Sequence, residues 1–391
     1  MMKILFLGTL YPHEREQEFM QKSRMFDFPG NALQWSLIEG FGQLVDLQIV
    51  TAPSSLRYQG LKCAGSTFSH NDGVTTDYSV DFIDIRVLKQ LISARNISKI
   101  IDNQYYDVIF IYSINANLLR PAYQYKKKHP NVKIVEIITD LPMLMSSSTS
   151  IIYRTLKRME VIADTKYMKA VDGFILLAPE MKNKLPIENK PWIQVEGIFN
   201  PKDKVKDSIS KAEGKVVLYT GNLDARYGIM DLLNAFSLTA DPSYRLWICG
   251  SGDSVEAIHN CEKRDNRIRF LGSVPRCEAL KLQKQATLLV NPRHSNEEYT
   301  KYSFPSKTME YMASGTPTLM SRLKSLPDDY ISHLLFFDDE NVEGMSKKLD
   351  EVLSKPSDLL AKFGNQAAEF IMNSKTSIHQ VKRIVDFIEK L

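Results

Sequence analysis

The segment Val108-Ile-Phe-Ile-Tyr112 is apolar at every position, and it decides the fold class of this chain. Such an unbroken run is typical of a strand buried on both faces of a parallel sheet, because a strand with one wet face alternates instead. Similar short runs alternate with longer helical patterns in the first half of the chain, at Lys3–Leu7, Asp46–Thr51, Lys133–Ile138, Gly173–Leu177 and Trp192–Val195. This alternation predicts an α/β fold of βαβ units in a doubly wound sheet.

A second series of strands is predicted in the other half, at Val216–Tyr219, Arg245–Cys249, Ile268–Leu271, Thr287–Val290, Thr318–Met320 and Leu334–Phe337. Residues 197–214 are polar, charged and poor in large apolar side chains, which is typical of a linker. We expect a Rossmann-like domain at 1–197, a linker at 198–214, a second Rossmann-like domain at 215–370, and a C-terminal helix at 371–391 that packs back on the first domain. Ligands bind at the carboxyl ends of such strands, so the domains are expected to face a central cleft.

The composition is that of an ordinary globular protein, with 391 residues, 43% apolar and 25% charged. A net charge of +4 gives no reason to expect nucleic acid as a partner. The four cysteines lack Cys-x-x-Cys spacing, so they indicate neither a disulfide framework nor zinc, and they fit a reducing cytosol. No apolar stretch reaches the ~20 residues that span a bilayer. We expect a cytoplasmic protein, or at most one peripheral on the inner face of the cell membrane.

Basic residues gather in two places in the first half of the chain. Lys126-Lys127-Lys128 is one cluster, and Arg154, Lys157, Arg158, Lys166 and Lys169 form the other. A solvated helix face is the preferred interpretation of both clusters. The alternative is a weak contact surface for an anionic membrane.

The segment Tyr302-Ser-Phe-Pro-Ser-Lys-Thr-Met-Glu-Tyr-Met-Ala-Ser-Gly-Thr-Pro317 predicts a short helix from Pro305 to Ser314. Proline suits the first turn of a helix, and Gly315 suits the position after its end. The free N–H groups at the start of such a helix suit a phosphate. Glu310, one turn further on, is placed to accept hydrogen bonds from a ribose diol. The alternative is an ordinary capped helix with Glu310 solvated.

Glycine turns or exposed backbone follow successive strands of the second half, all at the carboxyl side. Thr220-Gly-Asn-Leu-Asp-Ala-Arg-Tyr-Gly228 places Gly221 beside a ligand site and Arg226 where it can neutralise a phosphate. Gly250-Ser-Gly252 begins like a dinucleotide fingerprint, but position 255 is valine, which argues against a dehydrogenase. Phe270-Leu-Gly-Ser-Val-Pro275 and Asn291-Pro-Arg293 complete the set.

These motifs in this order resemble the family 4 glycosyltransferases with the GT-B fold, most closely the bacterial enzymes of polysaccharide or glycolipid assembly. The resemblance is carried by Tyr219-x-Gly221…Gly228-Ile, Gly250-Ser-Gly252, Phe270-Leu-Gly-Ser-Val-Pro275, Asn291-Pro-Arg293 and Ser303-Phe-Pro-Ser-Lys-x-x-Glu310-Tyr-Met-Ala-x-Gly315-x-Pro317. It covers the second half well and the first half loosely.

The resemblance implies a retaining hexosyltransferase that uses a nucleotide sugar, expected to be a UDP-sugar, without a metal or other cofactor. It implies that Glu310 binds the ribose hydroxyls, that the backbone of Ser303–Lys307 holds the diphosphate, and that Val274 flanks the base. Arg226 stands near the family's cation that stabilises the departing phosphate. The expected donor site comprises Gly221, Asn222, Gly250, Val274, Arg293, Tyr302, Ser303, Phe304, Pro305, Ser306 and Glu310, with Arg226 and Lys307 as catalytic cations.

Two positions depart from the family pattern. The family places a glutamate eight residues before the second one, and here that position is Tyr302; Glu297 and Glu298 are candidates to replace it. The family's phosphate-binding Arg and Lys fall on Asn222 and Tyr227. This leaves Arg226 and Lys307 as rival candidates for the neutralising cation.

The acceptor is expected in the first half, where Gly30-Asn31 predicts a turn at a helix start. Asp140 follows a strand and is a candidate to orient or deprotonate an acceptor hydroxyl, although a carboxylate that only caps the turn before Pro142 is the slightly preferred interpretation. His13 is a second acceptor-side candidate, although an exposed surface histidine is the preferred interpretation.

The predicted function is transfer of a sugar from a nucleoside-diphosphate sugar to a lipid-linked or polysaccharide acceptor. A nucleotide-sugar epimerase on the same fold, or a non-catalytic partner subunit related to these enzymes, are the alternatives. No Asp-x-Asp-like pair stands where a metal would be needed. Asp328-Asp329 and Asp338-Asp339 are interpreted as solvated surface.

Overall fold

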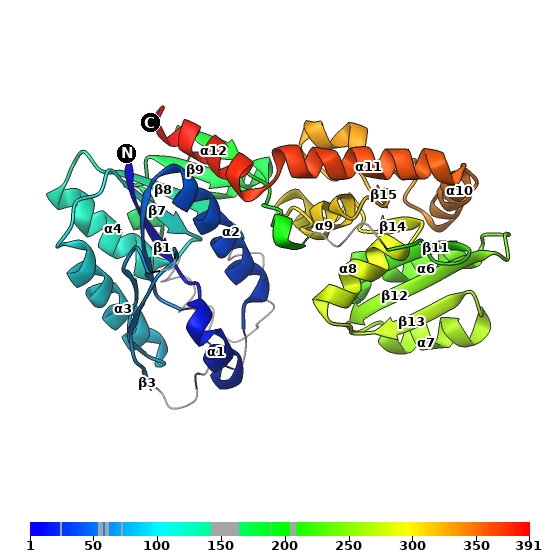
Figure 1. Cartoon of the computed structure of the whole chain (residues 1–391), viewed down its shortest axis with the longest axis horizontal. Helices are drawn as coiled ribbons and strands as arrows, with labels where there is room; N and C mark the ends of the chain where they lie inside the picture. The colour runs from blue at the N-terminus through cyan, green and yellow to red at the C-terminus, as the bar shows by residue number, and fades with distance from the viewer. Residues whose placement is uncertain are drawn as a thin grey trace. The chain divides into compact units, whose positions relative to one another are not determined.

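The computed structural model describes residues 1–23, 26–53, 58, 62–71, 73–141, 164–187, 189–203 and 209–391. The chain divides into two compact units (Figure 1). Unit 1 comprises Met1–Ile198 together with Ser377–Leu391, and unit 2 comprises Phe199–Thr376. The chain therefore passes from unit 1 to unit 2 after Ile198 and returns after Thr376.

Unit 1 contains an eight-stranded sheet in the order β10-β9-β8-β7-β1-β2-β5-β4. Every neighbouring pair is parallel except β4 and β5. The strands are β1 Lys3–Gly8, β2 Asp46–Thr51, β4 Ser66–Phe68, β5 Asp77–Ser79, β7 Val108–Tyr112, β8 Lys133–Ile138, β9 Gly173–Leu176 and β10 Trp192–Gln194, and β3 Lys62–Cys63 pairs separately with β6 Phe82–Ile83. The short strands β3 to β6 were not predicted, because two or three residues are too few to show a periodic pattern.

Helices cover both faces of the unit 1 sheet. The helices of this unit are α1 Glu16–Lys22, α2 Phe28–Leu44, α3 Arg86–Ile101, α4 Ala116–Lys128 and α12 Ser377–Ile388, with short 3-10 helices η1 His13–Arg15 and η2 Pro179–Lys184. Helices α2 and α12 lie side by side on one face, and α3 and α4 lie on the other (Figure 1). A Cβ on Gly40 of α2 would meet Val381 Cγ2 of α12 at 2.5 Å, so the small residue permits this close packing. The C-terminal helix α12 thus belongs to unit 1, and it begins at Ser377, whereas residue 371, the predicted start, lies in α11 of unit 2.

Unit 2 contains a six-stranded parallel sheet in the order β13-β12-β11-β14-β15-β16. Its strands are β11 Lys215–Asn222, β12 Tyr244–Ser251, β13 Ile268–Gly272, β14 Leu288–Asn291, β15 Thr318–Met320 and β16 Leu335–Phe336. Its helices are α6 Ile229–Ser237, α7 Val255–Arg264, α8 Arg276–Gln285, α9 Lys307–Ala313, α10 Val342–Leu353 and α11 Ser357–Ser374, with η3 Pro201–Asp203, η4 Ala225–Tyr227, η5 Glu298–Lys301 and η6 Asp328–His333. Two Rossmann-like units confirm the predicted fold class.

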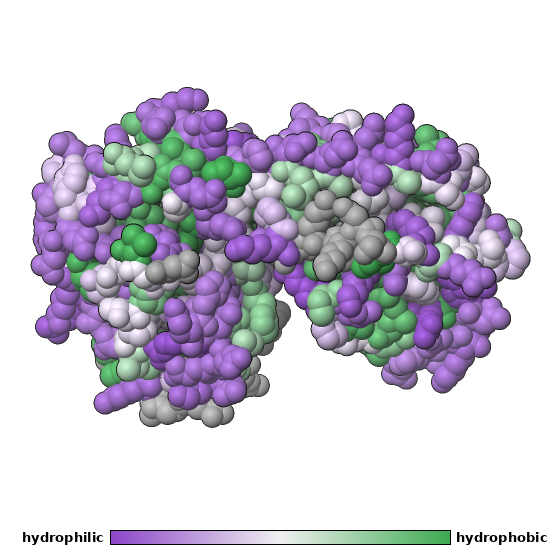
Figure 2. Space-filling view, in the orientation of Figure 1, coloured by the Kyte–Doolittle hydropathy of each residue, from purple (hydrophilic) through white to green (hydrophobic). Residues whose placement is uncertain are grey.

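Alternate residues of β11 show how both faces of this sheet are buried. Val217 and Tyr219 pack with residues of α6 and α10, whereas Val216 and Leu218 pack with Tyr311 of α9 on the opposite face. This two-sided burial explains why the strand reads as a continuous apolar run. On the visible face of the molecule, most of the surface is hydrophilic (Figure 2).

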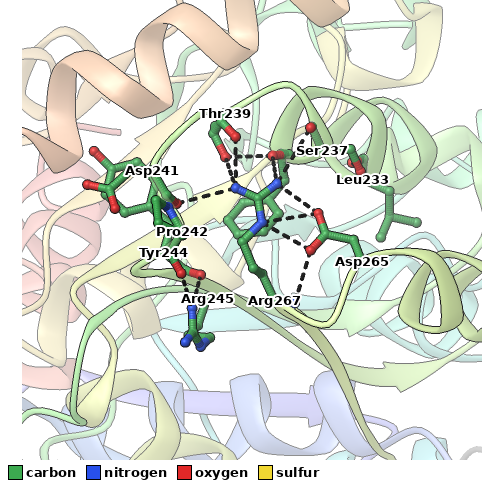
Figure 3. Close-up of polar contacts among 10 residues, drawn as sticks. Leu233, Ser237, Thr239, Asp241, Pro242, Tyr244, Arg245, Asp265 and Arg267 are labelled. Atoms are coloured by element: carbon green, nitrogen blue, oxygen red, sulfur yellow. Dashed lines mark hydrogen bonds and ion pairs between the residues drawn. The ribbon is translucent and has the colours of Figure 1, made fainter.

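Arg267, just before β13, ties the end of α6 to the sheet (Figure 3). Its guanidinium donates to the Thr239 carbonyl at 2.7 Å and forms a two-pronged contact with Asp265, the shorter bond being 2.7 Å. The hydrogen bond and charge of Arg267 lower the pKa of Asp265. This network lies at the amino ends of the strands and is structural, whereas the predicted ligand residues lie at the carboxyl ends.

No helix among the described residues is long and apolar enough to span a membrane.

Candidate functional site

The backbone turns of unit 2 meet at the carboxyl ends of β11 and β12. Gly221 and Gly250 are register partners in these neighbouring strands. A Cβ on Gly250 would lie 1.8 Å from the Gly221 carbonyl oxygen, so only glycine fits this position. Asn222 is exposed beside them, and its side chain accepts a hydrogen bond from the Asp224 N–H at 2.8 Å. Gly221 and Gly250, which the sequence places in turns after the strands, thus lie among the last two residues of β11 and β12, and they meet at the carboxyl edge of the sheet.

Glu310 is the best-organised charged group at this edge. It lies on α9, is only 9% exposed, and is surrounded by three donors. Its Oε1 accepts from Gln283 Nε2 at 2.6 Å and from Lys307 Nζ at 2.8 Å, and its Oε2 lies 3.3 Å from Arg276 Nη2. Burial favours the protonated acid, but the charge and hydrogen bond of Lys307, aided by Gln283 and Arg276, hold the pKa of Glu310 below its usual value.

A fully buried layer of polar groups lies behind Glu310. Gln283 Nε2 also donates to Thr220 Oγ1 at 3.2 Å. The Tyr311 hydroxyl accepts from the Thr220 N–H at 2.7 Å and donates to the Thr220 carbonyl at 2.9 Å. Glu310 is thereby linked, through side chains, to the residue that precedes the Gly221 turn. Sequence reasoning missed Arg276, Gln283, Thr220 and Tyr311, because no spacing marks them.

Two guanidinium groups flank Tyr227 at the same end of the sheet. The Arg226 guanidinium carbon lies 4.8 Å from the centre of the Tyr227 ring, and that of Arg293 lies 4.6 Å from it. Within the described part of the chain, neither arginine forms an ion pair with a carboxylate. A Cβ on Gly228 would meet the Pro292 carbonyl oxygen at 2.1 Å, so this glycine lets the two loops approach. The two guanidinium groups therefore give this end of the sheet positive charge, which suits an anion.

The loop that follows Arg293 is anchored on both sides. His294 Nε2 lies 2.7 Å from Asp231 Oδ2 of α6, and its Nδ1 lies 3.6 Å from Glu340 Oε2. Further along, the Tyr302 hydroxyl donates to Glu298 Oε1 at 3.0 Å. Glu298, a candidate to replace the missing family glutamate, is thus hydrogen-bonded to Tyr302, which occupies that glutamate's position. The other candidate, Glu297, is exposed.

The predicted helix at Pro305–Ser314 begins later than expected. Helix α9 starts at Lys307 and Ser306 is its exposed N-cap. Pro305 precedes the N-cap, and its carbonyl accepts the Thr308 N–H at 2.8 Å. Gly315 has a φ of +77°, which suits the predicted helix end. Ser303 Oγ donates to the Tyr299 carbonyl at 3.2 Å, and the Phe304 ring packs in the core 5.5 Å from Tyr330. Val274 is partly buried against the core beside α8.

The acceptor-side candidates of unit 1 fall into two neighbouring groups. Asp140 follows β8 and lies near Asp27, whose side chain caps α2 by accepting the Gly30 N–H at 3.0 Å. Desolvation of the Asp140 carboxyl, together with the charge of Asp27, raises its pKa to about 6. A Cβ on Gly30 would meet the Asp27 carboxylate at 2.1 Å. Gly30 lies in the first turn of α2, at the helix start that the sequence predicts.

The second acceptor-side group is built around Glu16. Asn31 is buried, donates to Glu16 Oε1 at 2.6 Å and accepts the Tyr11 N–H at 2.9 Å, so both the nitrogen and the oxygen of its amide form a hydrogen bond. His13 lies 3.9 Å from Glu16 Oε2 and stacks on the ring of Trp35 with centroids 3.9 Å apart. Its side chain is 63% exposed.

The basic clusters are only partly described. Lys126 pairs with Asp172 at 2.5 Å, whereas the ammonium of Lys127 lies 4.6 Å from the Tyr123 ring. Lys166 lies 5.9 Å from the ring of Tyr167. Arg154, Lys157 and Arg158 lie outside the described residues. Among the described residues, no group of three or more His, Cys, Asp or Glu side chains is arranged to hold a metal ion.

Comparison with known proteins agrees with this architecture. Residues 201–370 match the family model described as glycosyl transferases group 1. A comparison with curated proteins finds no match. The match to a glycosyl transferase group 1 domain thus covers most of unit 2, which comprises Phe199–Thr376.

Several solved structures share the fold over the whole chain. Sucrose-phosphate synthase from Thermosynechococcus elongatus has a TM-score of 0.64 at 13% identity, with 100% of this chain and 99% of that one covered. Anabaena Alr3699/HepE in complex with UDP has a TM-score of 0.64 at 14% identity, with both chains covered completely at 100%. The lipopolysaccharide outer core galactosyltransferase WaaB has a TM-score of 0.66 at 16% identity, again with 100% of both chains covered. At such identities the likeness shows the fold, which is GT-B.

Proposed function

We propose that this chain is a retaining, metal-independent transferase that moves a sugar from a UDP-sugar to a lipid-linked or polysaccharide acceptor. The observation that carries the proposal is the buried, ionised Glu310, held by Gln283, Lys307 and Arg276 inside a group 1 domain. A carboxylate accepts hydrogen bonds and cannot donate them, so it suits a pair of hydroxyls such as the ribose diol. The structure of Anabaena Alr3699/HepE with UDP-glucose supports this choice of donor.

The charges of the site suit departure of a diphosphate. Negative charge develops on the leaving group while the anomeric carbon becomes positive, and fixed cations that are already in place stabilise that charge best. Arg226 and Arg293 supply two such cations, and Lys307 supplies a third beside Glu310. This arrangement can perform the role that a metal performs in other sites, which supports a reaction without one.

The acceptor side rests on Asp140. A carboxyl whose pKa is near 6 is a usable general base close to neutral pH. We place the acceptor hydroxyl at Asp140, and we assign Gly30, Asn31 and His13 to the surrounding loops rather than to chemistry. The galactosyltransferase WaaB, whose description names the lipopolysaccharide outer core, supports a glycolipid or glycan acceptor. The lysines at Lys127 and Lys166, beside tyrosine rings, are the proposed contact with an anionic membrane.

The proposal is tested with a panel of UDP-sugars, by measuring UDP release with and without membrane extract and in the presence of a chelator. We expect one donor to be turned over, with the rate unchanged by the chelator and increased by the extract. NMR of the product should show that the anomeric configuration is retained. Absence of UDP binding and of turnover with every donor refutes the proposal, and loss of turnover in the chelator refutes metal independence.

A further inference from the structure

Gln283 occupies an unusual position behind the candidate donor site. It lies in the last turn of α8 and is completely buried. One side-chain nitrogen serves two acceptors, Glu310 Oε1 at 2.6 Å and Thr220 Oγ1 at 3.2 Å. Its side-chain oxygen is buried and accepts no hydrogen bond from the described residues. Buried amides rarely leave an oxygen unsatisfied, so this arrangement calls for a reason.

The orientation of the Gln283 amide is dictated by Glu310. An ionised carboxylate can only accept, so the amide must turn its N–H groups toward it, and the oxygen is left on the far side. The Gln283 side-chain oxygen is therefore left without a hydrogen bond from the described part of the chain because the amide nitrogen is turned toward Glu310.

The two oxygens of Glu310 are held unequally. Oε1 is engaged twice, by the buried Gln283 and by Lys307. Oε2 is contacted by Arg276 at 3.3 Å, and the Arg276 side chain is 54% exposed. An exposed side chain can leave at little cost, whereas a buried one cannot. Oε1 is thus the anchored oxygen and Oε2 is the one that a ligand can take over.

Gln283 also joins Glu310 to the turn at Gly221. Its N–H group contacts the Thr220 hydroxyl, and the backbone of Thr220 is clamped from both sides by the Tyr311 hydroxyl. Tyr311 follows Glu310 directly on α9. A shift of the backbone at Gly221 would therefore reach the Glu310 carboxylate through the buried hydrogen bonds of Thr220 and Gln283.

We propose that Gln283 is a positioning residue that presents Oε2 of Glu310 to the ribose hydroxyls of the donor and keeps it in register with the Gly221 turn. This inference rests on the proposed function, because it deepens the role of Glu310 there. Gln283 would thus favour a nucleotide with both ribose hydroxyls over one that lacks them, although Gln283 does not itself touch the ligand.

The first test compares UDP with 2′,3′-dideoxy-UDP by calorimetry. The substitution Gln283→Met removes both the N–H donor and the side-chain oxygen, and the methionine side chain has a length similar to that of glutamine. We expect UDP to bind roughly tenfold more weakly, which is the effect of removing one hydrogen bond to a charged group. Binding of the dideoxy nucleotide should change less than twofold, because it lacks the hydroxyls through which Gln283 acts. Gln285→Met, on the same helix, is the matched control and should alter neither affinity.

The second test uses Gln283→Glu, which has the same shape. Two carboxyl groups this close cannot both ionise freely, so one of them keeps a proton at moderately low pH. A protonated Glu at this position can donate to Glu310 as the amide does. We expect the UDP affinity of Gln283→Glu to approach that of the parent at pH 5 and to fall at pH 8, which a merely structural role would not produce.

The outcomes separate this inference from the function on which it rests. Unchanged UDP affinity in Glu310→Ala overturns the ribose assignment and the proposed function with it. If Glu310→Ala weakens binding but Gln283→Met weakens both nucleotides equally, or neither, then the positioning role is overturned and the proposed function stands. Thermal melting of each variant identifies general loss of structure, which would affect both nucleotides alike and so also count against the positioning role.

Discussion

Replacing Glu310 by glutamine is the most direct test of the donor site. The substitution keeps the shape of the side chain and leaves an amide oxygen that Gln283 and Lys307 can still contact. The substitution removes the negative charge of the Glu310 carboxylate. A hydrogen bond to a charged group contributes about 1.5–3 kcal/mol and one between neutral groups about 0.5–1.5, so each ribose bond should weaken by about 1–1.5 kcal/mol. Two such bonds amount to about 2–3 kcal/mol, or roughly 30- to 150-fold in the Kd of UDP.

The assay is calorimetric titration with UDP at pH 7.5, where Glu310 is ionised because its pKa is below the usual value. Glu369→Gln, an exposed position on α11, is the matched control and should bind like the parent. Melting should show little change, since Lys307 and Arg276 are partly exposed and can be solvated by water. A Kd within threefold of the parent, from a variant that melts normally, would refute the reasoning.

Three further predictions concern other charged groups. Arg293→Met should lower the rate of transfer by about tenfold or more, because it removes one fixed cation from the leaving diphosphate; a steady-state rate equal to that of the parent would show that Arg226 and Lys307 suffice. The rate of transfer at limiting acceptor should rise with pH through about 6, because Asp140 acts as a base only when it is deprotonated. Asp140→Asn should abolish that rise and lower the rate by about 10²-fold or more. UDP binding should be retained in this variant. Glu136, fully buried in β8 with neither carboxyl oxygen bonded among the described residues, should lower the stability of unit 1 at neutral pH. Burial, and then the charge of Asp164, raise the pKa of Glu136 well above 4.5 in the folded state. As the pH rises above 4.5, the unfolded chain loses this proton before the folded chain does, so the free energy of unfolding falls. Glu136→Met should therefore gain about 1–3 kcal/mol at pH 8 and less at pH 5, as measured by denaturant unfolding at both pH values; an equal change at the two would contradict this account.

The sequence predicts the fold well because its main signal is local. Runs such as Val108–Tyr112 are apolar at each position, and burial on both faces is visible without knowledge of their neighbours. The strands β3 to β6 escape prediction because they are two or three residues long. The start of α9 was placed two residues early, because proline suits several positions at a helix start and only the backbone geometry chooses among them.

The candidate site is predictable only where a residue type carries the signal. Glu310 stands out as a lone carboxylate among turn residues, and Gly250 stands out as a glycine after a strand. Gln283 carries no such mark, since its partner Thr220 lies 63 residues away, and Tyr311 contacts Thr220 across 91 residues. The pairing of Arg226 and Arg293 around Tyr227 likewise depends on two loops that meet only in the folded chain.

The return of α12 to unit 1 has a consequence for synthesis on the ribosome. Unit 2 is one continuous stretch, so it can fold as soon as residues 199–376 have emerged. Unit 1 begins earlier, but its core lacks Val381, Ile384 and Phe387 until α12 has been made. The part of the chain that is translated first is therefore completed last, and in the interval the face of α2 that α12 covers is exposed to chaperones and to other nascent chains.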